Sequence, residues 1–364
     1  MSPSFPDIAL RAKCVRFLGG HGPSTARDWI TRLATSPALD DLPDVYSEGA
    51  GMQRLEAEVA GLLGKPAALF FHKGVTAQQA ALLVHAGVTG RRVVALHSRS
   101  HLALDESDTL DRLAGLVSRR VGSDLAPFGV ADLVRVAEPL AAVTVEVPLR
   151  RAGFLGTSWD ELVGISAWAR AAGVPFHLDA ARIWEMGPWY GRSLAEIAAL
   201  SDSVYVSFYK GLGGMGGCVL AGSPEFIAAC RPWRNRFGGD LPTIFPYVVS
   251  ALDGLKAHLP RMTEYYEHAR AIAAAINARP GVRTFPEAPH GNSFRVVFEA
   301  PVARLEAAAT AIAQERGVWL FNRFEALALP SHSFGEVVSG AATLGWSPDA
   351  AADAVAEVAR RAAV

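Results

Sequence analysis

The chain has 364 residues, of which 50% are hydrophobic and 9% aromatic, so it is long and apolar enough to fold around more than one core. Its 35 basic residues nearly balance its 36 acidic residues, and no basic stripe is present, which argues against binding nucleic acid or an anionic membrane. No apolar run approaches the roughly 20 residues needed to span a bilayer.

The three cysteines, Cys14, Cys218 and Cys230, include no pair at a metal-binding or redox spacing, which favours a reducing compartment. The first six residues have neither the charged flank nor the apolar core of a secretory signal. We therefore expect a cytoplasmic protein with no metal site.

Apolar, strand-like runs alternate with alanine-rich helical stretches from about residue 54 to residue 222. This alternation predicts an α/β fold with a mainly parallel sheet. The expected strands are residues 67–71, 93–96, 142–147, 174–178, 204–208 and 218–221. Residues 159–172 are expected to form a helix, because Leu162, Ile165 and Trp168 recur at helical spacing, and this apolar face is expected to be core.

Beyond Pro246 longer helical segments replace this alternation, at residues 248–259 and 262–279. A small α+β lobe is expected to follow, with a strand, a helix, an apolar run and a terminal helix at residues 293–298, 302–315, 317–321 and from 348 on. We therefore expect an N-terminal arm (1–50), a large domain (51–246) and a small C-terminal domain (247–364).

Lys210 follows the strand-like segment 203–208 and precedes the glycine-rich stretch 211–217. A lysine at the mouth of a buried strand, where glycines let the backbone approach closely, is in a setting where an amine loses its proton and attacks a carbonyl. This favours a Schiff-base lysine. Taken alone, a lysine in this position is more often a surface residue that begins a loop.

Residues 211–216 also satisfy the dinucleotide-binding pattern G-x-G-x-x-G. That pattern should follow a first strand and open a helix, whereas these glycines lead directly into the apolar segment 218–222. We therefore predict two neighbouring antiparallel strands joined by a glycine loop.

Asp179 and Arg182 follow the apolar segment 176–178, at the end of a strand where ligands bind in open α/β sheets. An ionised aspartate there needs a cation. The protonated ring nitrogen of pyridoxal phosphate is one such cation, and its pairing with an aspartate keeps the ring an electron sink while a lysine holds the aldehyde. Without this context, an aspartate that closes a strand is more often a helix N-cap.

Taken in order, these segments resemble the threonine aldolase and β-eliminating lyase family of fold-type-I pyridoxal-phosphate enzymes. The resemblance rests on residues 44–48, 54–59, 67–71 with Gly74, 177–182 and 210–213. It implies a PLP-transferase-like fold with a large domain built on a mainly parallel, seven-stranded-type sheet and a small C-terminal α+β domain. It also implies pyridoxal 5'-phosphate as cofactor, and a homodimer or homotetramer with shared active sites.

The resemblance further implies roles for individual residues. Lys210 would form the Schiff base, Asp179 would pair with the pyridine nitrogen, and Arg182 would face the phenolic oxygen of the cofactor and the carboxylate of the substrate. His101 would stack on the ring, with Glu106 five residues further on beside the substrate. The catalytic residues expected are thus Lys210, His101 and Asp179.

His97 competes with His101 for the stacking role. Either histidine is, without the family, more often a solvated loop residue, and two histidines four apart with no nearby cysteine make a poor metal site.

The cofactor phosphate is expected where Gly74, Val75 and Thr76 open a helix, because free backbone N–H groups and the helix dipole favour an anion there. The family usually has a hydroxyl residue directly after this glycine, where this chain has Val75. The hydroxyl contact with the phosphate is then expected from Thr76, or the charge of Lys73 compensates for its loss. A simple glycine-capped turn is the structural alternative.

Two departures from the family pattern concern basic groups. Residues 16–21 replace a serine-aspartate-threonine stretch that helps bind the substrate carboxylate. Residues 238–243 lack the arginine that reaches a neighbouring subunit's phosphate, for which Arg234 or Arg236 are the candidate replacements.

A third departure adds negative charge. Glu336 occupies a late strand-like segment, residues 335–340, where the family usually carries an arginine and a histidine. Together with Asp240, it is expected to disfavour a plain α-carboxylate and to favour a cationic group.

Three functional hypotheses follow. The first is retro-aldol cleavage of the Cα–Cβ bond in β-hydroxy-α-amino acids, giving glycine and an aldehyde, with His101 or a water taking the hydroxyl proton. The second is β-elimination or other carbanion chemistry at Cα, because the bond perpendicular to the cofactor ring is the one that breaks. The third is a protein of this fold that binds cofactor without turnover, against which the presence of both Lys210 and Asp179 argues.

Overall fold

The computed structural model describes residues 7–123, 125–329 and 331–363. Contacts between residues divide the chain into two compact units. One is Trp29–Pro260, and the other joins the described residues up to Asp28 to those from Arg261 on. The domain boundaries expected after residues 50 and 246 remain a prediction.

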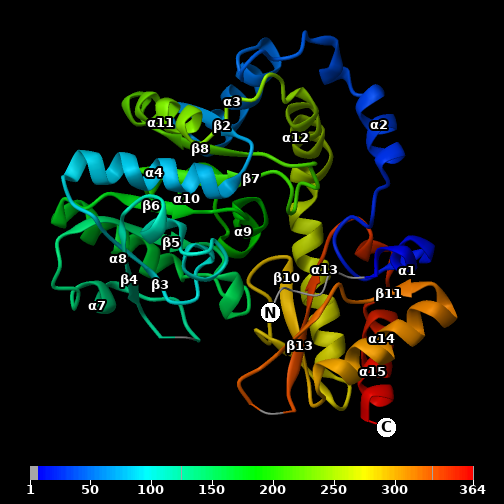
Figure 1. The fold of residues 1–364 in the computed structure, drawn as a ribbon. Coiled ribbons are helices and arrows are strands. Elements are labelled where there is room, and N and C mark those ends of the chain that lie inside the picture. The colour runs from blue at the N-terminus through cyan, green and yellow to red at the C-terminus, as the bar shows by residue number, and fades with distance from the viewer. Residues whose placement is uncertain (1–6, 124, 330, 364) are drawn as a thin grey trace. The chain divides into compact units, whose positions relative to one another are not determined.

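A seven-stranded sheet with the order β2-β8-β7-β6-β5-β3-β4 forms the centre of the unit Trp29–Pro260 (Figure 1). Its strands are β2 (Ala67–Phe71), β3 (Val93–His97), β4 (Val117–Val121), β5 (Leu140–Glu146), β6 (Phe176–Asp179), β7 (Ser203–Ser207) and β8 (Cys218–Gly222). Strand β8 is antiparallel to both of its neighbours, and the other pairs are parallel. The predicted α/β fold with a mainly parallel sheet is confirmed.

The central strands are continuous apolar runs because helices cover the sheet. Every residue of β5, β7 and β8 is buried. Helix α4 (Gly74–Thr89) contacts five strands and packs against α11 (Pro224–Arg236), as Figure 1 shows. Helices α3 (Ala50–Leu63), α8 (Trp159–Ala172) and α12 (Phe245–His258) belong to the same unit.

The shorter helices of this unit connect the strands. They are α5 (His101–Leu104), α6 (Thr109–Arg112), α7 (Val130–Leu133), α9 (Ile183–Tyr190), α10 (Leu194–Ala199) and the 3-10 helices Pro37–Asp40 and Arg150–Ala152, while α2 (Ala26–Ala34) and the 3-10 helix Leu259–Arg261 cross its boundaries. Helices α3, α4 and α8 each end at a glycine with positive φ, which lets the backbone turn away without strain.

Strand β4 is not among the strands predicted from the sequence. It lies at the edge of the sheet, and its sequence, Val-Ser-Arg-Arg-Val, exposes polar side chains to solvent. Charged residues are common on edge strands because they discourage pairing with another chain. Because of these charged residues, the segment is not an apolar run and was not predicted as a strand.

The second unit contains an antiparallel sheet with the order β12-β13-β10-β9. Its elements are α1 (Ile8–Lys13), β1 (Arg16–Phe17), α13 (Met262–Asn277), β9 (Val282–Phe285), β10 (Ser293–Phe298), α14 (Val302–Arg316), β11 (Val318–Trp319), β12 (Phe324–Ala326), β13 (Ser333–Val338), the 3-10 helix Thr343–Gly345 and α15 (Pro348–Ala363). Phe294, Val296 and Val337 of the sheet share a core with Ile272 and Val355 of the helices. Strand β1 pairs in parallel with β11, so the N-terminal segment belongs to this small α+β unit.

No helix within the described residues is long and apolar enough to cross a membrane.

Helix α12 supports the glycine-rich loop that joins β7 to β8. A Cβ atom on Gly254 of α12 would lie 2.5 Å from the carbonyl oxygen of Leu212, and one on Gly216 would lie 2.5 Å from the ring of Tyr247. The N–H of Met215 donates a 3.1 Å hydrogen bond to the Ser250 hydroxyl. The loop that follows Lys210 is therefore packed directly against a helix.

We expect Gly254→Ala to destabilise the protein by about 1–3 kcal/mol, because the added methyl group displaces the backbone at Leu212. Thermal unfolding of the apoprotein is the measurement. Gly61→Ala is the matched control, since Gly61 lies in α3 with no atom within 4 Å of its would-be Cβ, and alanine there should stabilise the helix by about 0.5–1 kcal/mol. Equal unfolding midpoints for Gly254→Ala and the wild type would contradict this account of the loop.

Candidate active site

The carboxyl ends of three adjacent parallel strands bring polar side chains into one row. Glu146 closes β5 and is the register partner of Asp179 at the end of β6, which in turn pairs with Tyr205 of β7. Parallel strands end at the same edge of the sheet, where ligands bind in open α/β folds. Lys210 follows β7 at this same edge.

Asp179 is a buried carboxyl group without a local partner. It is 2% exposed, and its Oδ1 has no hydrogen-bond partner among the described residues. Burial, and then the neighbouring Glu146, raise the pKa of Asp179 to about 7, although Lys210 and His101 oppose this rise. The alternative role of Asp179 as a helix N-cap does not occur, because the cap of α9 is Arg182.

The amine of Lys210 is a weaker base than that of an ordinary lysine. Burial and the nearby guanidinium of Arg182 lower its pKa to about 8, while Asp179, Glu146 and Glu185 partly oppose this change. An amine with such a pKa is neutral in a far larger fraction of molecules near neutral pH than an ordinary lysine is. It is therefore suited to attack a carbonyl.

The glycine-rich stretch after Lys210 leads into β8, which pairs antiparallel with β7. This arrangement was predicted from the sequence and excludes the dinucleotide-binding alternative, in which a helix would follow the glycines. Gly213 and Gly217 have φ values of +63° and +83°, so the loop needs residues without a side chain at these turns.

His101 and Glu106 form a hydrogen-bonded pair next to the strand ends. His101 Nδ1 lies 2.9 Å from Glu106 Oε1, and the backbone N–H of His101 donates to Glu146 Oε2 at 2.6 Å. Burial alone lowers the pKa of His101, but the hydrogen bond to Glu106 and the charges of Asp179, Glu106 and Glu146 together raise it above its ordinary value. His101 is thus a histidine held by carboxylates.

His97 has a different environment. Its Nδ1 accepts a 2.9 Å hydrogen bond from the Arg99 N–H, and its Nε2 lies 2.8 Å from the carbonyl oxygen of Ala126. The ring is buried and stacks on Phe128. Both nitrogens are therefore occupied by backbone groups, so His97 stabilises its loop and His101 is the candidate for the site.

Helix α4 begins at Gly74 beside the same row. Lys73 is its N-cap and provides no side-chain cap, and the Thr76 hydroxyl donates to the Lys73 carbonyl at 2.7 Å. A Cβ atom on Gly74 would lie 2.2 Å from the Tyr205 hydroxyl, so only glycine fits at this helix start. The first N–H groups of a helix have no partner within it, which leaves those of Gly74, Val75 and Thr76 available to an anion.

Arg234, a candidate replacement for the missing phosphate-binding arginine, is held by contacts within its own chain. It is 3% exposed, its Nε lies 2.6 Å from Asp240 Oδ1, and its Nη1 donates to the Phe70 carbonyl at 3.1 Å. Arg236 lies over the Trp233 ring at 4.5 Å. Asp240 is therefore balanced by a buried cation, and the expectation that it favours a cationic substrate group remains a prediction.

Glu336 is likewise opposed by an arginine of its own sheet. It pairs in register with Arg295 of β10, whose Nη2 lies 3.9 Å from Glu336 Oε1 and whose guanidinium stacks on Phe334. The two acids that the sequence singled out thus each face a cation.

Glu146 and Glu185 were not among the residues predicted for the site. Glu146 closes a fully buried apolar strand, a signal that the sequence does contain, since a carboxylate there must face the ligand edge or a partner. Glu185 lies in a short helix, where its burial depends on tertiary packing and no local pattern shows it.

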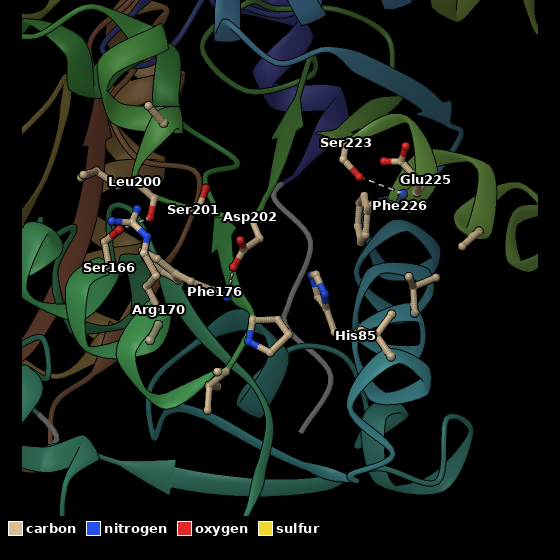
Figure 2. Close-up of a pocket in the computed structure, with 18 residues that line it drawn as sticks. His85, Ser166, Arg170, Phe176, Leu200, Ser201, Asp202, Ser223, Glu225 and Phe226 are labelled. Atoms are coloured by element: carbon tan, nitrogen blue, oxygen red, sulfur yellow. Dashed lines mark hydrogen bonds between the residues drawn. The ribbon is translucent and has the colours of Figure 1, made fainter.

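A cavity of about 560 Å³ lies at the opposite edge of the sheet (Figure 2). Its lining includes Phe176, the first residue of β6, and Asp202, which directly precedes β7. His85 of α4 and Phe226 of α11 also line it. It contains none of the predicted site residues. The cavity is therefore separate from the candidate active site.

Between this cavity and the active-site edge, a buried hydrogen-bond chain joins α4 to the sheet. His85 Nε2 lies 2.7 Å from Ser203 Oγ, Ser203 Oγ lies 2.8 Å from His177 Nδ1, and His177 Nε2 lies 2.6 Å from Gln78 Oε1. Burial lowers the pKa of His85 to about 4 and that of His177 to about 3, so both imidazoles are neutral at physiological pH.

The mixed sheet, with a half-buried lysine after one strand and an aspartate at the end of its neighbour, is the arrangement of fold-type-I pyridoxal-phosphate enzymes. A sequence model of the family described as "Beta-eliminating lyase" matches residues 33–299. The chain belongs to this family. The predicted resemblance to the threonine aldolase and β-eliminating lyase group is thereby confirmed.

Individual relatives agree with this assignment. The chain is 28% identical to low-specificity L-threonine aldolase 1 of Arabidopsis thaliana, over 70% of this chain and 74% of that protein. It is 35% identical to the structure of a Listeria monocytogenes protein proposed to be an L-allo-threonine aldolase, with a TM-score of 0.89 over 97% of both chains. A β-eliminating lyase or threonine aldolase candidate from Exiguobacterium sp. 255-15 superposes with a TM-score of 0.90 at 33% identity, over 97% of this chain and 99% of the other.

We expect Glu106→Gln to lower the pKa of His101, because glutamine keeps a hydrogen-bond acceptor but removes a negative charge next to the imidazole. The raised pKa also means that the charged imidazolium stabilises the fold at low pH, and that this contribution is lost as pH rises through the pKa of His101 in the folded protein. Measurement of the imidazole titration by NMR, with His101→Asn to assign the signal, tests this. An unchanged midpoint would show that Glu106 does not hold the proton.

Proposed function

We propose that the protein is a pyridoxal-phosphate-dependent lyase that cleaves the Cα–Cβ bond of β-hydroxy-α-amino acids, giving glycine and an aldehyde. The observation that carries this proposal is the placement of Lys210 and Asp179 together at the carboxyl edge of adjacent strands β6 and β7. Family membership and the nearly full-length likeness to two solved structures support it.

The residues at this edge fit pyridoxal phosphate. Asp179 has a buried oxygen without a hydrogen-bond partner among the described residues, and a protonated ring nitrogen would supply the cation that lets this acid ionise. Lys210 has the lowered pKa needed for attack on the aldehyde. The start of α4, where Tyr205 excludes any side chain on Gly74, fits the phosphate. When bound, the cofactor supplies an electron sink for the bond that breaks at Cα.

His101 has the environment of a group that takes and returns a proton. In retro-aldol cleavage the hydroxyl proton of the substrate must leave as the Cα–Cβ bond breaks. Glu106 orients the His101 ring through Nδ1, so Nε2 is the nitrogen that remains to face a substrate. Arg182 supplies a positive charge close to Lys210, as expected of a residue that binds the substrate carboxylate.

A second candidate reaction is β-elimination, which the description of the matched family favours. It needs the same Lys210 and Asp179, and differs in which substituent of Cα stands perpendicular to the cofactor ring. Release of pyruvate and ammonia from a β-substituted amino acid distinguishes it from release of glycine.

We also propose a homodimer or homotetramer with shared active sites, located in the cytoplasm. The support is indirect. Family likeness underlies the oligomer, and the three cysteines, all of them unpaired and buried, are compatible with a reducing compartment.

We expect Lys210→Ala to lower glycine release from β-hydroxy amino acids by roughly a thousandfold or more, the scale seen when a covalent nucleophile is removed. Borohydride reduction followed by mass spectrometry should find pyridoxyl-modified Lys210 in the wild type and no such peptide in the variant. Lys256→Ala, at an exposed position of α12, is the control and should retain both properties. Full glycine release by Lys210→Ala would overturn the assignment.

A further inference from the structure

Glu185 is a buried carboxylate that reaches the turn after Lys210. It lies in the first turn of α9, which follows β6, and it is 2% exposed. Its Oε1 accepts a hydrogen bond from the Gly211 N–H at 3.0 Å. Helix α9 is thereby joined to the backbone directly after the candidate Schiff-base lysine.

The contact is so close that it requires glycine at position 211. A Cβ atom there would lie 2.2 Å from Glu185 Oε1 and 2.5 Å from its Cδ. The Glu185 carboxylate therefore fills the space that a side chain at residue 211 would take. Gly211 directly follows Lys210 in the chain, so any movement of this turn also moves the Lys210 backbone.

The second carboxylate oxygen has no comparable contact. Glu185 Oε2 is buried and has no hydrogen-bond partner among the described residues. An unsatisfied buried carboxylate oxygen is costly, so the charge of Glu185 depends on nearby cations. Burial raises the pKa of Glu185, and the cations that oppose this rise are Arg182 and Lys210.

We propose that Glu185 is a positioning residue for Lys210, whose Oε1 fixes the turn at Gly211 and whose negative charge acts on the nearby amine. The inference deepens the proposed function and rests on it.

The charge of Glu185 matters because the surroundings of Lys210 are finely balanced. The charged groups that act on the amine are Asp179 from β6, Glu146 from β5, Arg182 at the start of α9 and Glu185 itself. Arg182 disfavours the ammonium and the three acids favour it. Removal of the Glu185 charge should therefore shift Lys210 toward its neutral form.

Two substitutions separate the two roles. Glu185→Gln keeps an oxygen for the Gly211 N–H and removes the charge, whereas Glu185→Ala removes both. Glu267→Gln is the matched control, because Glu267 is exposed on α13 in the other unit. If the alanine variant does not fold, the glutamine variant still tests the charge.

The measurement is the pH dependence of Lys210 modification in the apoprotein by an amine-reactive reagent, quantified for the Lys210 peptide by mass spectrometry. We expect the midpoint for Glu185→Gln to be lower by about 1 than that of the wild type, and that of Glu267→Gln to be unchanged. Affinity for pyridoxal phosphate should fall about tenfold or more in Glu185→Ala and less in Glu185→Gln.

The outcomes distinguish this inference from the proposed function. Failure of pyridoxal phosphate to modify Lys210 in the wild type would refute the function. Normal modification of the wild type with the same midpoint in Glu185→Gln would refute only the role of Glu185.

Discussion

The structure depends on one electrostatic constraint, the placement of a half-buried amine among carboxylates at the edge of a sheet. A charge in a low-dielectric interior is tolerated only where opposite charges and hydrogen bonds compensate it. The parallel strands β5 and β6 deliver Glu146 and Asp179 to that edge, and α9 delivers Glu185 from the adjacent turn. Arg182 on the same turn keeps these acids from holding the Lys210 proton too firmly. The pKa of the amine is lowered as a result.

Small residues make this arrangement possible, because the backbone must come close to the charged groups. Gly211 leaves room for Glu185, Gly74 leaves room for Tyr205, and Gly254 of α12 lets a helix support the loop after Lys210. Each is a contact between elements distant in sequence. The glycine-rich appearance of the chain near Lys210 thus reflects close packing around the site rather than freedom of the loop.

The sequence predicted the parts of the molecule that depend on local pattern. Apolar runs identified the central strands, and strand ends identified Asp179 and Lys210, because burial and alternation are encoded residue by residue. The polar edge strand β4 and the buried Glu185 escaped notice, since charged residues usually indicate exposure. The ion pair between Arg234 and Asp240 was not predicted either, because it forms through tertiary packing that no spacing shows.

The hydrogen-bond chain from His85 through Ser203 and His177 to Gln78 has a consequence for α4 as a whole. Apolar contacts have no preferred direction, whereas hydrogen bonds hold only over a narrow range of distance and angle. A neutral imidazole has one donor nitrogen and one acceptor nitrogen. The hydrogen bonds are therefore all donated in one direction, from His85 to Ser203, from Ser203 to His177 and from His177 to Gln78. These bonds hold the helix in register along its axis. The direction in which its first N–H groups point, from Gly74 on, therefore depends on polar residues one to three turns further along the same helix.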